Sequence, residues 1–276
     1  MNPNANHQIS LTSLFTSVVK NWTLIFHMSK RDVVGRYKGS YIGILWSFFY
    51  PVLMLFIYTF VFSVVFQSRW PGVDSSNKTQ FAFLLFVGML IHGLFAEVIN
   101  KAPSLVLSNA NYVKKVIFPL EILSIADLFS GLFHSLVSFF VLLLALVIFN
   151  YQLYWTIILF PLILLPYLFF ILGLTWIIAS IGVFVRDIGQ AINVLTTILL
   201  FLSPVFYSKT ALPTNFQLWM NMNPLTFIIE QCRNVLIIGK LPDFLSLLIY
   251  SISSFLFMWL GYFWFQKTRK GFADVL

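Results

Sequence analysis

Long apolar runs with almost no charged residue recur along the whole 276-residue chain. A helix needs about 20 mainly apolar residues to cross roughly 30 Å of hydrocarbon, and several runs approach that length. Hydrophobic residues make up 59% of the chain and charged residues only 9%, whereas a soluble domain carries about 25% charged residues. The sequence therefore predicts an all-α polytopic membrane protein. A membrane β-barrel is excluded, because its strands alternate polar and apolar positions and 139–149 is apolar throughout.

Six of these runs are predicted to cross the membrane. Ahead of them, residues 11–30 carry apolar side chains at helical spacing beside lysines, which predicts an amphipathic helix lying in the membrane interface. Because residues 1–10 are polar, no cleavable signal peptide is predicted. We divide the chain into a cytoplasmic N-terminal segment, 1–40, and a transmembrane domain, 41–276. The expected spans are about 41–66, 81–99, 122–149, 155–185, 188–206 and 244–265.

The segment 207–242, between the last two runs, is partly apolar but is not expected to span. Its apolar stretch 225–238 would reach only about 22 Å at 1.5 Å per residue. It also contains Glu230 and Arg233, whose spacing suits either an ion pair on one helix face or a gating contact. We predict two short helices that re-enter the outer leaflet. They cover 214–222 and 225–238 and are broken at Asn223 and Pro224.

The 17 Lys and Arg residues lie between the apolar runs rather than on one solvated face. The net charge of +8 is therefore interpreted as a topology signal, and no nucleic-acid partner is expected. Six spans place both ends of the chain on one side, and that side holds twelve of the 17 basic residues. The positive-inside rule thus predicts that both termini are cytoplasmic.

Motifs for catalysis, nucleotide binding or metal binding are not found in this sequence. The four histidines are scattered and Cys232 is the single cysteine, so neither a metal site nor an enzymatic activity is expected. Ionisable residues inside spans are still candidates for function. Asp127 and His134 lie two helical turns apart on one face, which fits either a proton relay or hydrogen bonds to a neighbouring helix. Glu97 lies near the cytoplasmic end of its span and is expected to snorkel.

Short motifs occur in order along nearly the whole chain. They are RYKGSYIGILW at 36–46 followed by Tyr50-Pro51, SNANYVKKVIFPLE at 108–121, SPVFY at 203–207, Asn223-Pro224-Leu225, Glu230, Arg233 and Phe272-Ala273-Asp274. This ordered set resembles the permeases of type-2 ABC exporters, in the branch that exports O-antigen, capsular polysaccharide and teichoic acid. The resemblance implies a homodimer that sits on two ATP-binding cassette subunits in a bacterial cytoplasmic membrane. It implies ATP and Mg bound by those partners, no cofactor in this chain, and a lipid-linked glycan as substrate.

The polar loop between the second and third spans is bracketed by Pro103 and Pro119, and the resemblance implies that it couples the permease to its ATPase. Lys114 and Lys115 are expected either to face an acidic rim on the ATPase or to serve only as inside anchors. The residues assigned to coupling are Asn111, Tyr112, Lys114, Lys115, Phe118, Pro119 and Glu121.

Aromatic residues make up 18% of the chain and are dense in the first span. Their flat apolar faces suit a path for sugars, and a lipid pyrophosphate needs cations near the inner leaflet. The cytoplasmic entrance is assigned to Arg36, Tyr37 and Lys38, whose two cations are equally compatible with anchoring. The path is assigned to Trp46, Tyr50, Phe206 and Tyr207, and the periplasmic gate to Pro204, Asn223, Pro224, Glu230 and Arg233.

These expectations describe the transmembrane subunit of an ATP-driven exporter for a lipid-linked polysaccharide. Two alternatives stay open, namely a type-2 ABC permease for a small drug or lipid and an ion-coupled flippase without a motor. The flippase is disfavoured, because no carboxylate lies at the middle of the first, fourth, fifth or sixth span.

Overall fold

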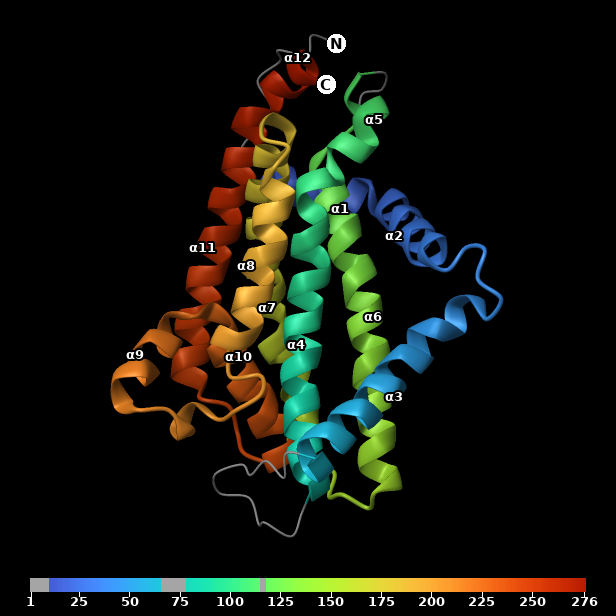
Figure 1. Ribbon diagram of the computed structural model, residues 1–276. Helices are drawn as coiled ribbons and strands as arrows, with labels where there is room; N and C mark the ends of the chain where they lie inside the picture. The colour runs from blue at the N-terminus through green and yellow to red at the C-terminus, as the bar shows by residue number, and fades with distance from the viewer. Residues whose placement is uncertain (1–9, 66–77, 115–117) are drawn as a thin grey trace.

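The computed structural model describes residues 10–65, 78–114 and 118–276, and the regular structure in these residues is helical. Within these described ranges, five helices are long and apolar enough to cross a membrane. They include α3 (Trp46–Tyr58), α4 (Lys78–Leu105), α6 (Glu121–Ile148), α7 (Phe160–Phe184) and α11 (Phe244–Thr268). Helices α4, α6, α7 and α11 stand side by side as a bundle, and α3 crosses it obliquely (Figure 1). The prediction of an all-helical membrane protein is therefore confirmed, with five candidate spans.

Helix α8 (Ile188–Leu202) is the apolar helix at the position of the fifth predicted span. Its 15 residues reach only about 22 Å, short of the roughly 30 Å of a hydrocarbon core. The helix ends at Leu202 because Ser203 precedes Pro204 and adopts an extended conformation, as the proline ring requires of the residue before it. The predicted helix over 188–206 is therefore too long at its C-terminal end.

The predicted amphipathic helix over 11–30 is wrong as a single element. The structure has α1 (Leu11–Lys20) and α2 (Trp22–Arg36), separated at Asn21. The Asn21 side chain donates a hydrogen bond of 2.7 Å to the Ser17 carbonyl, and such side-chain bonds to the backbone compete with helix continuation. Helix α2 packs across α6 and ends at Arg36.

Two short helices follow α8 at the predicted positions. They are α9 (Thr214–Met222) and α10 (Pro224–Arg233), the latter continued by a π-helical turn over Asn234–Ile238. Asn223 caps α10 by accepting a hydrogen bond from the Leu225 amide at 3.0 Å. Pro224 occupies the first helical position, where the missing N–H costs nothing. Their predicted boundaries are confirmed to within one residue.

Helix α4 is the centre of the bundle, and α3 lies at its edge (Figure 1). In the most apolar stretch of α4, 78% of the residues are buried inside the molecule, against 6% in α3. Among α3 residues only Pro51 is buried. Helix α3 therefore presents most of its aromatic surface outward.

Close packing of α7 on α11 depends on two glycines. A Cβ atom at Gly261 would lie 2.3 Å from the carbonyl oxygen of Gly173, so a side chain there cannot be accommodated. Small residues are typical where membrane helices pack backbone to backbone. Helix α12 (Phe272–Val275) follows α11, and it lies with α5 (Ala110–Lys114) and α1 at one end of the bundle (Figure 1).

Short helical turns connect the remaining segments. They are Gly43–Leu45, Thr59–Val65, Leu107–Asn109, Trp155–Leu159, Lys209–Ala211 and Arg269–Gly271.

Candidate functional site

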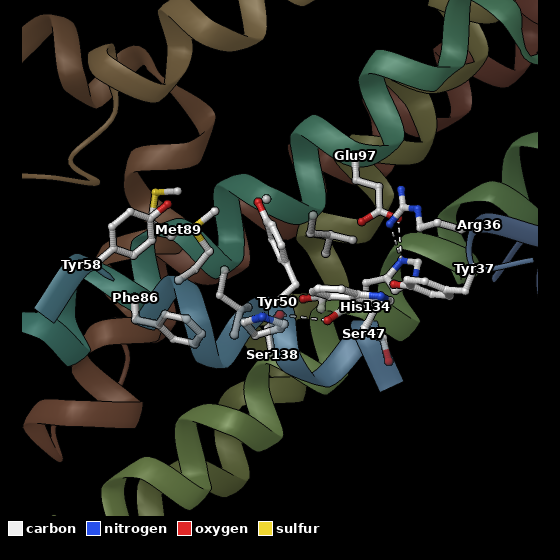
Figure 2. A pocket seen from close by; sticks show the side chains of 17 residues that line it. Arg36, Tyr37, Ser47, Tyr50, Tyr58, Phe86, Met89, Glu97, His134 and Ser138 are labelled. Atoms are coloured by element: carbon white, nitrogen blue, oxygen red, sulfur yellow. Dashed lines mark hydrogen bonds and ion pairs between the residues drawn. The ribbon is translucent and has the colours of Figure 1, made fainter. Parts of the chain in front are cut away.

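A pocket of about 470 Å³ lies between the end of α2 and helices α3, α4 and α6 (Figure 2). Four residues assigned from the sequence to the entrance or the path line it together: Arg36, Tyr37, Trp46 and Tyr50. Trp46 and Tyr50 are one helical turn apart on α3, so one face of that helix presents both rings. The structure therefore joins the predicted entrance to the first part of the predicted path.

One end of the pocket is charged. Arg36 Nη1 lies 3.0 Å from Glu97 Oε1, and His134 Nδ1 lies 2.7 Å from the same oxygen. Arg36 Nη1 also lies 3.1 Å from His134 Nδ1, so all three side chains meet at one point. An ionised carboxylate only accepts hydrogen bonds, and the Glu97 contact is the shorter of the two at Nδ1, which assigns the His134 proton to Nδ1 facing Glu97. The Tyr37 ring meets the His134 ring edge-on, with centroids 5.9 Å apart. Burial raises the pKa of the Tyr37 hydroxyl, and the neighbouring Arg36 opposes that shift.

The rest of the pocket is walled by aromatic rings and methionines. Met54 and Tyr58 contribute from α3, and Phe86 and Met89 contribute from α4 (Figure 2). The distance along α4 from Phe86 to Glu97 is about 16 Å at 1.5 Å per residue. The pocket is therefore elongated and amphipathic, with its charged end toward the end of the bundle that carries α5.

A second polar cluster lies next to the pocket and ties α2 to α4 and α6. Lys101 Nζ lies 2.9 Å from Asp32 Oδ2 and 2.6 Å from Asp127 Oδ1. The Asp127 side chain is only 4% exposed, and a buried carboxylate needs such a partner. The sequence left two roles open for Asp127 and His134, a proton relay or hydrogen bonds to a neighbouring helix. The structure shows helix-to-helix contacts, because each of the two residues binds a side chain of α4.

Glu97 and His134 are pocket residues that the sequence did not assign to the entrance. The available signal was their position as ionisable groups inside spans, which favours an interior location. Their contacts depend on how α4 packs on α6 and how α2 packs across α6. That tertiary arrangement is not encoded in local spacing.

Two predicted path residues lie away from this pocket. The Phe206 ring stacks on Phe62, with centroids 5.6 Å apart and an interplanar angle of 19°. The Tyr207 hydroxyl donates a hydrogen bond of 2.7 Å to the Phe201 carbonyl. Lys38 follows α2 on the exposed turn and does not line the pocket. The predicted entrance and path are therefore only partly joined in one subunit.

Most predicted gate residues do meet. Arg233 is buried and donates three hydrogen bonds to backbone carbonyls. Its acceptors are Leu84 at 2.8 Å, Pro204 at 2.5 Å and Val205 at 2.8 Å. The Asn223 amide donates to Ser203 Oγ at 2.8 Å, which joins α10 to the same turn.

The buried guanidinium fits because α4 has a glycine beside it. A Cβ atom at Gly88 would lie 2.8 Å from Arg233 Nη2. Glu230 lies one helical turn before Arg233 and is partly buried. Pro204, Asn223, Pro224 and Arg233 thus form one joint between α4, the end of α8 and α10.

The predicted coupling segment is anchored from inside the subunit. The Tyr112 and Phe118 rings stack with centroids 4.5 Å apart. Glu121 is buried, accepts a hydrogen bond from Ser17 Oγ at 2.9 Å and pairs with Arg269 Nη1 at 3.0 Å. Arg269 also donates to the Phe118 carbonyl at 2.6 Å. Glu121 therefore links α1, α6 and the end of α11 rather than facing outward.

The other coupling residues are less constrained by the structure. Asn111 is exposed and Pro119 is partly exposed. Lys114 ends α5, its side chain lies outside the described part of the structure, and Lys115 lies wholly outside the described residues.

Comparison with known proteins agrees with this architecture. Residues 23–237 match the ABC-2 type transporter family. The chain is 27% identical over 253 residues to the O-antigen export system permease protein RfbA of Myxococcus xanthus, with 91% of this chain and 94% of that protein covered. It is 26% identical over 258 residues to a protein of the same name from Klebsiella pneumoniae, with 92% and 95% covered. The chain therefore belongs to the ABC-2 type transporter family, as a membrane permease without an ATPase site of its own.

Proposed function

We propose that this chain is the transmembrane subunit of an ATP-driven exporter that moves a lipid-linked polysaccharide across the bacterial cytoplasmic membrane. The observation that carries this proposal is the elongated pocket with Arg36 at one end and aromatic walls beyond it. Such a pocket suits a substrate with an anionic group at one end and sugar or apolar groups behind it. The names of the similar proteins, both O-antigen export permeases, support the same substrate class.

The proposed topology has six spans, with α8 and the turn after it forming the fifth. Helix α1, which ends at Lys20, and helix α12, which follows the basic turn Arg269–Gly271, lie at the same end of the bundle as α5 (Figure 1). This supports a shared cytoplasmic location for both termini. On this topology α9 and α10 re-enter the membrane from the outer side. Irregular backbone at that depth needs protein cover, and the bonds of Arg233 and Asn223 supply it.

The proposed assembly is a homodimer on two ATP-binding cassette subunits. ABC-2 permeases pair with ATP-binding subunits, and ATP with Mg belongs to those partners. Helix α5 forms the contact surface for the ATPase, held in place by Tyr112, which stacks on the buried Phe118 ring. The outward aromatic face of α3 and the exposed apolar face of α8 are the surfaces offered to the second copy, so that two subunits enclose the path.

In this proposal the substrate enters at Arg36, Tyr37 and Lys38, passes Trp46 and Tyr50, and leaves at the joint built on Arg233. A glycan cannot cross hydrocarbon with unpaired hydroxyl groups. The proposed path therefore runs between protein surfaces throughout.

The test is translocation by the permease reconstituted with its ATPase in liposomes. For permease inserted with its ATPase on the outer face, a lipid-linked glycan in the outer leaflet is expected to reach the lumen only with ATP. An ATPase variant lacking its catalytic carboxylate is the control. ATP-driven movement of a small lipid, with no movement of the glycan, would contradict the proposed substrate class.

A further inference from the structure

The charged end of the pocket already contains an anionic side chain, Glu97. Glu97 Oε1 contacts Arg36 through a single guanidinium nitrogen, Nη1, at 3.0 Å. Arginine binds a phosphate group through two parallel N–H···O bonds. The contact with Glu97 involves only one nitrogen and one oxygen, so it does not use this two-bond geometry. The Arg36 side chain is 48% exposed, so its guanidinium remains accessible from the pocket.

The Glu97 carboxylate also has a second hydrogen-bond partner. His134 Nδ1 donates to the same carboxylate oxygen at 2.7 Å, and the edge-on packing of Tyr37 orients the imidazole ring. When Arg36 turns to another anion, the Glu97 carboxylate keeps this hydrogen bond. A partly buried carboxylate is therefore not left unpaired, which removes the main cost of releasing the arginine.

Beyond the charged end, the pocket walls suit the body of an amphiphile rather than a second charge. Met54, Met89 and Phe86 line the far end, and only hydroxyl groups such as those of Ser47 and Ser138 interrupt the apolar surface. The ligand chemistry that fits is a phosphate-bearing anion with an apolar or sugar-like group attached.

We propose that Glu97 and His134 form a latch on Arg36, in which Glu97 competes with the phosphate group of the substrate and His134 retains Glu97 once the phosphate has taken Arg36. This proposal rests on the proposed function and assigns positioning roles to two residues of its entrance. The latch sets how strongly an anion must bind before Arg36 is released. It makes opposite predictions for the two residues.

The experiment measures binding of radiolabelled farnesyl pyrophosphate to the full-length permease in nanodiscs of zwitterionic lipid. Glu97→Gln keeps the shape of the side chain and removes the competing charge, so affinity is expected to rise about three- to fivefold. His134→Phe keeps the ring but removes the donor, so releasing Arg36 strands Glu97 and affinity is expected to fall by a similar factor. Asp187→Asn, on the exposed turn before α8, is the matched charge control and is expected to change nothing.

Further variants and probes test whether the gain in affinity depends on Arg36 and which ligand is bound. In an Arg36→Gln background the Glu97→Gln gain is expected to disappear. Glu97→Asp, which keeps the charge but shortens the reach, is expected to give a smaller gain and replaces Glu97→Gln if that variant does not fold. Inorganic pyrophosphate and farnesol are the probes for a free anion and a neutral chain. A gain with inorganic pyrophosphate assigns the latch to a free phosphate anion, and a gain confined to the farnesyl probe assigns it to a lipid headgroup.

Unchanged or weaker binding by Glu97→Gln would overturn the latch, as would a gain that persists without Arg36. A gain that farnesol shares equally would overturn it as well, because no anion would then be involved. The proposed function is judged separately, by ATP-driven glycan translocation of the wild-type complex, so either idea can fail while the other stands.

Discussion

Two arginines at opposite parts of the molecule show how differently one side chain is used. Arg36, at the end of α2, is half exposed and touches its carboxylate partner through one nitrogen. Arg233, in α10, is 3% exposed and donates to three carbonyls from α4 and the turn after α8. A partly exposed ion pair contributes about 1 kcal/mol or less, whereas a buried charge that loses its partners costs several kcal/mol. Arg36 is therefore available to bind a ligand, whereas Arg233 stabilises the folded structure.

The largest expected effect is on the buried arginine. Replacing Arg233 by Met leaves the carbonyls of Leu84, Pro204 and Val205 without their donor, and we expect a loss of about 3 kcal/mol in the free energy of unfolding. Arg233→Lys retains the charge but not the planar fork, so an intermediate loss is expected. Thermal unfolding of the purified permease measures both. Equal stability of Arg233→Met and wild type would remove the distinction between the two arginines.

An intermediate effect is expected beside the entrance. Asp127→Asn removes the buried partner of Lys101 but leaves Asp32 in place, so we expect a loss of about 1–2 kcal/mol. Asp32→Asn removes the more exposed partner, whose side chain is 24% exposed, and is expected to cost less than about 1 kcal/mol. The same unfolding measurement compares them. A larger loss for Asp32→Asn would show that burial does not rank these pairs.

Local sequence rules predicted the elements better than the contacts between them. The predicted break at Asn223 and Pro224 follows from capping. The end of α8 before Pro204 follows from the backbone restriction that proline imposes, although the span predicted over 188–206 ran past it. Trp46 and Tyr50 share a face because they are four residues apart on one helix. These features depend on neighbours in sequence, so local rules are enough to explain them.

What the sequence did not predict depends on packing between distant segments. Glu97 reaches His134 because α4 packs on α6, and it reaches Arg36 because α2 packs across α6. Phe206 turns to Phe62 rather than to the pocket, although its residue type suited the path equally well. Glu121 lies in a polar loop signature, yet it is buried between Ser17 and Arg269. Residue type and spacing do not specify which helix face meets which neighbour.

The smallest expected effect on stability is at Arg36, together with the largest effect on transport. Arg36→Gln combined with Lys38→Gln is expected to change the free energy of unfolding by about 1 kcal/mol or less, because both side chains are substantially exposed. Lys20→Gln with Lys30→Gln removes the same charge from exposed positions of α1 and α2 outside the pocket, and it is the matched control.

ATP-driven translocation of the lipid-linked glycan by these two double variants, at equal amounts of inserted permease, tests the role of the pocket most directly. Loss of the charge-assisted hydrogen bonds to the substrate is expected to lower the rate of the Arg36 and Lys38 variant by about tenfold. The Lys20 and Lys30 variant is expected to translocate at the wild-type rate. Equal rates for the two double variants would contradict an entrance at Arg36 and would assign its charge to membrane anchoring.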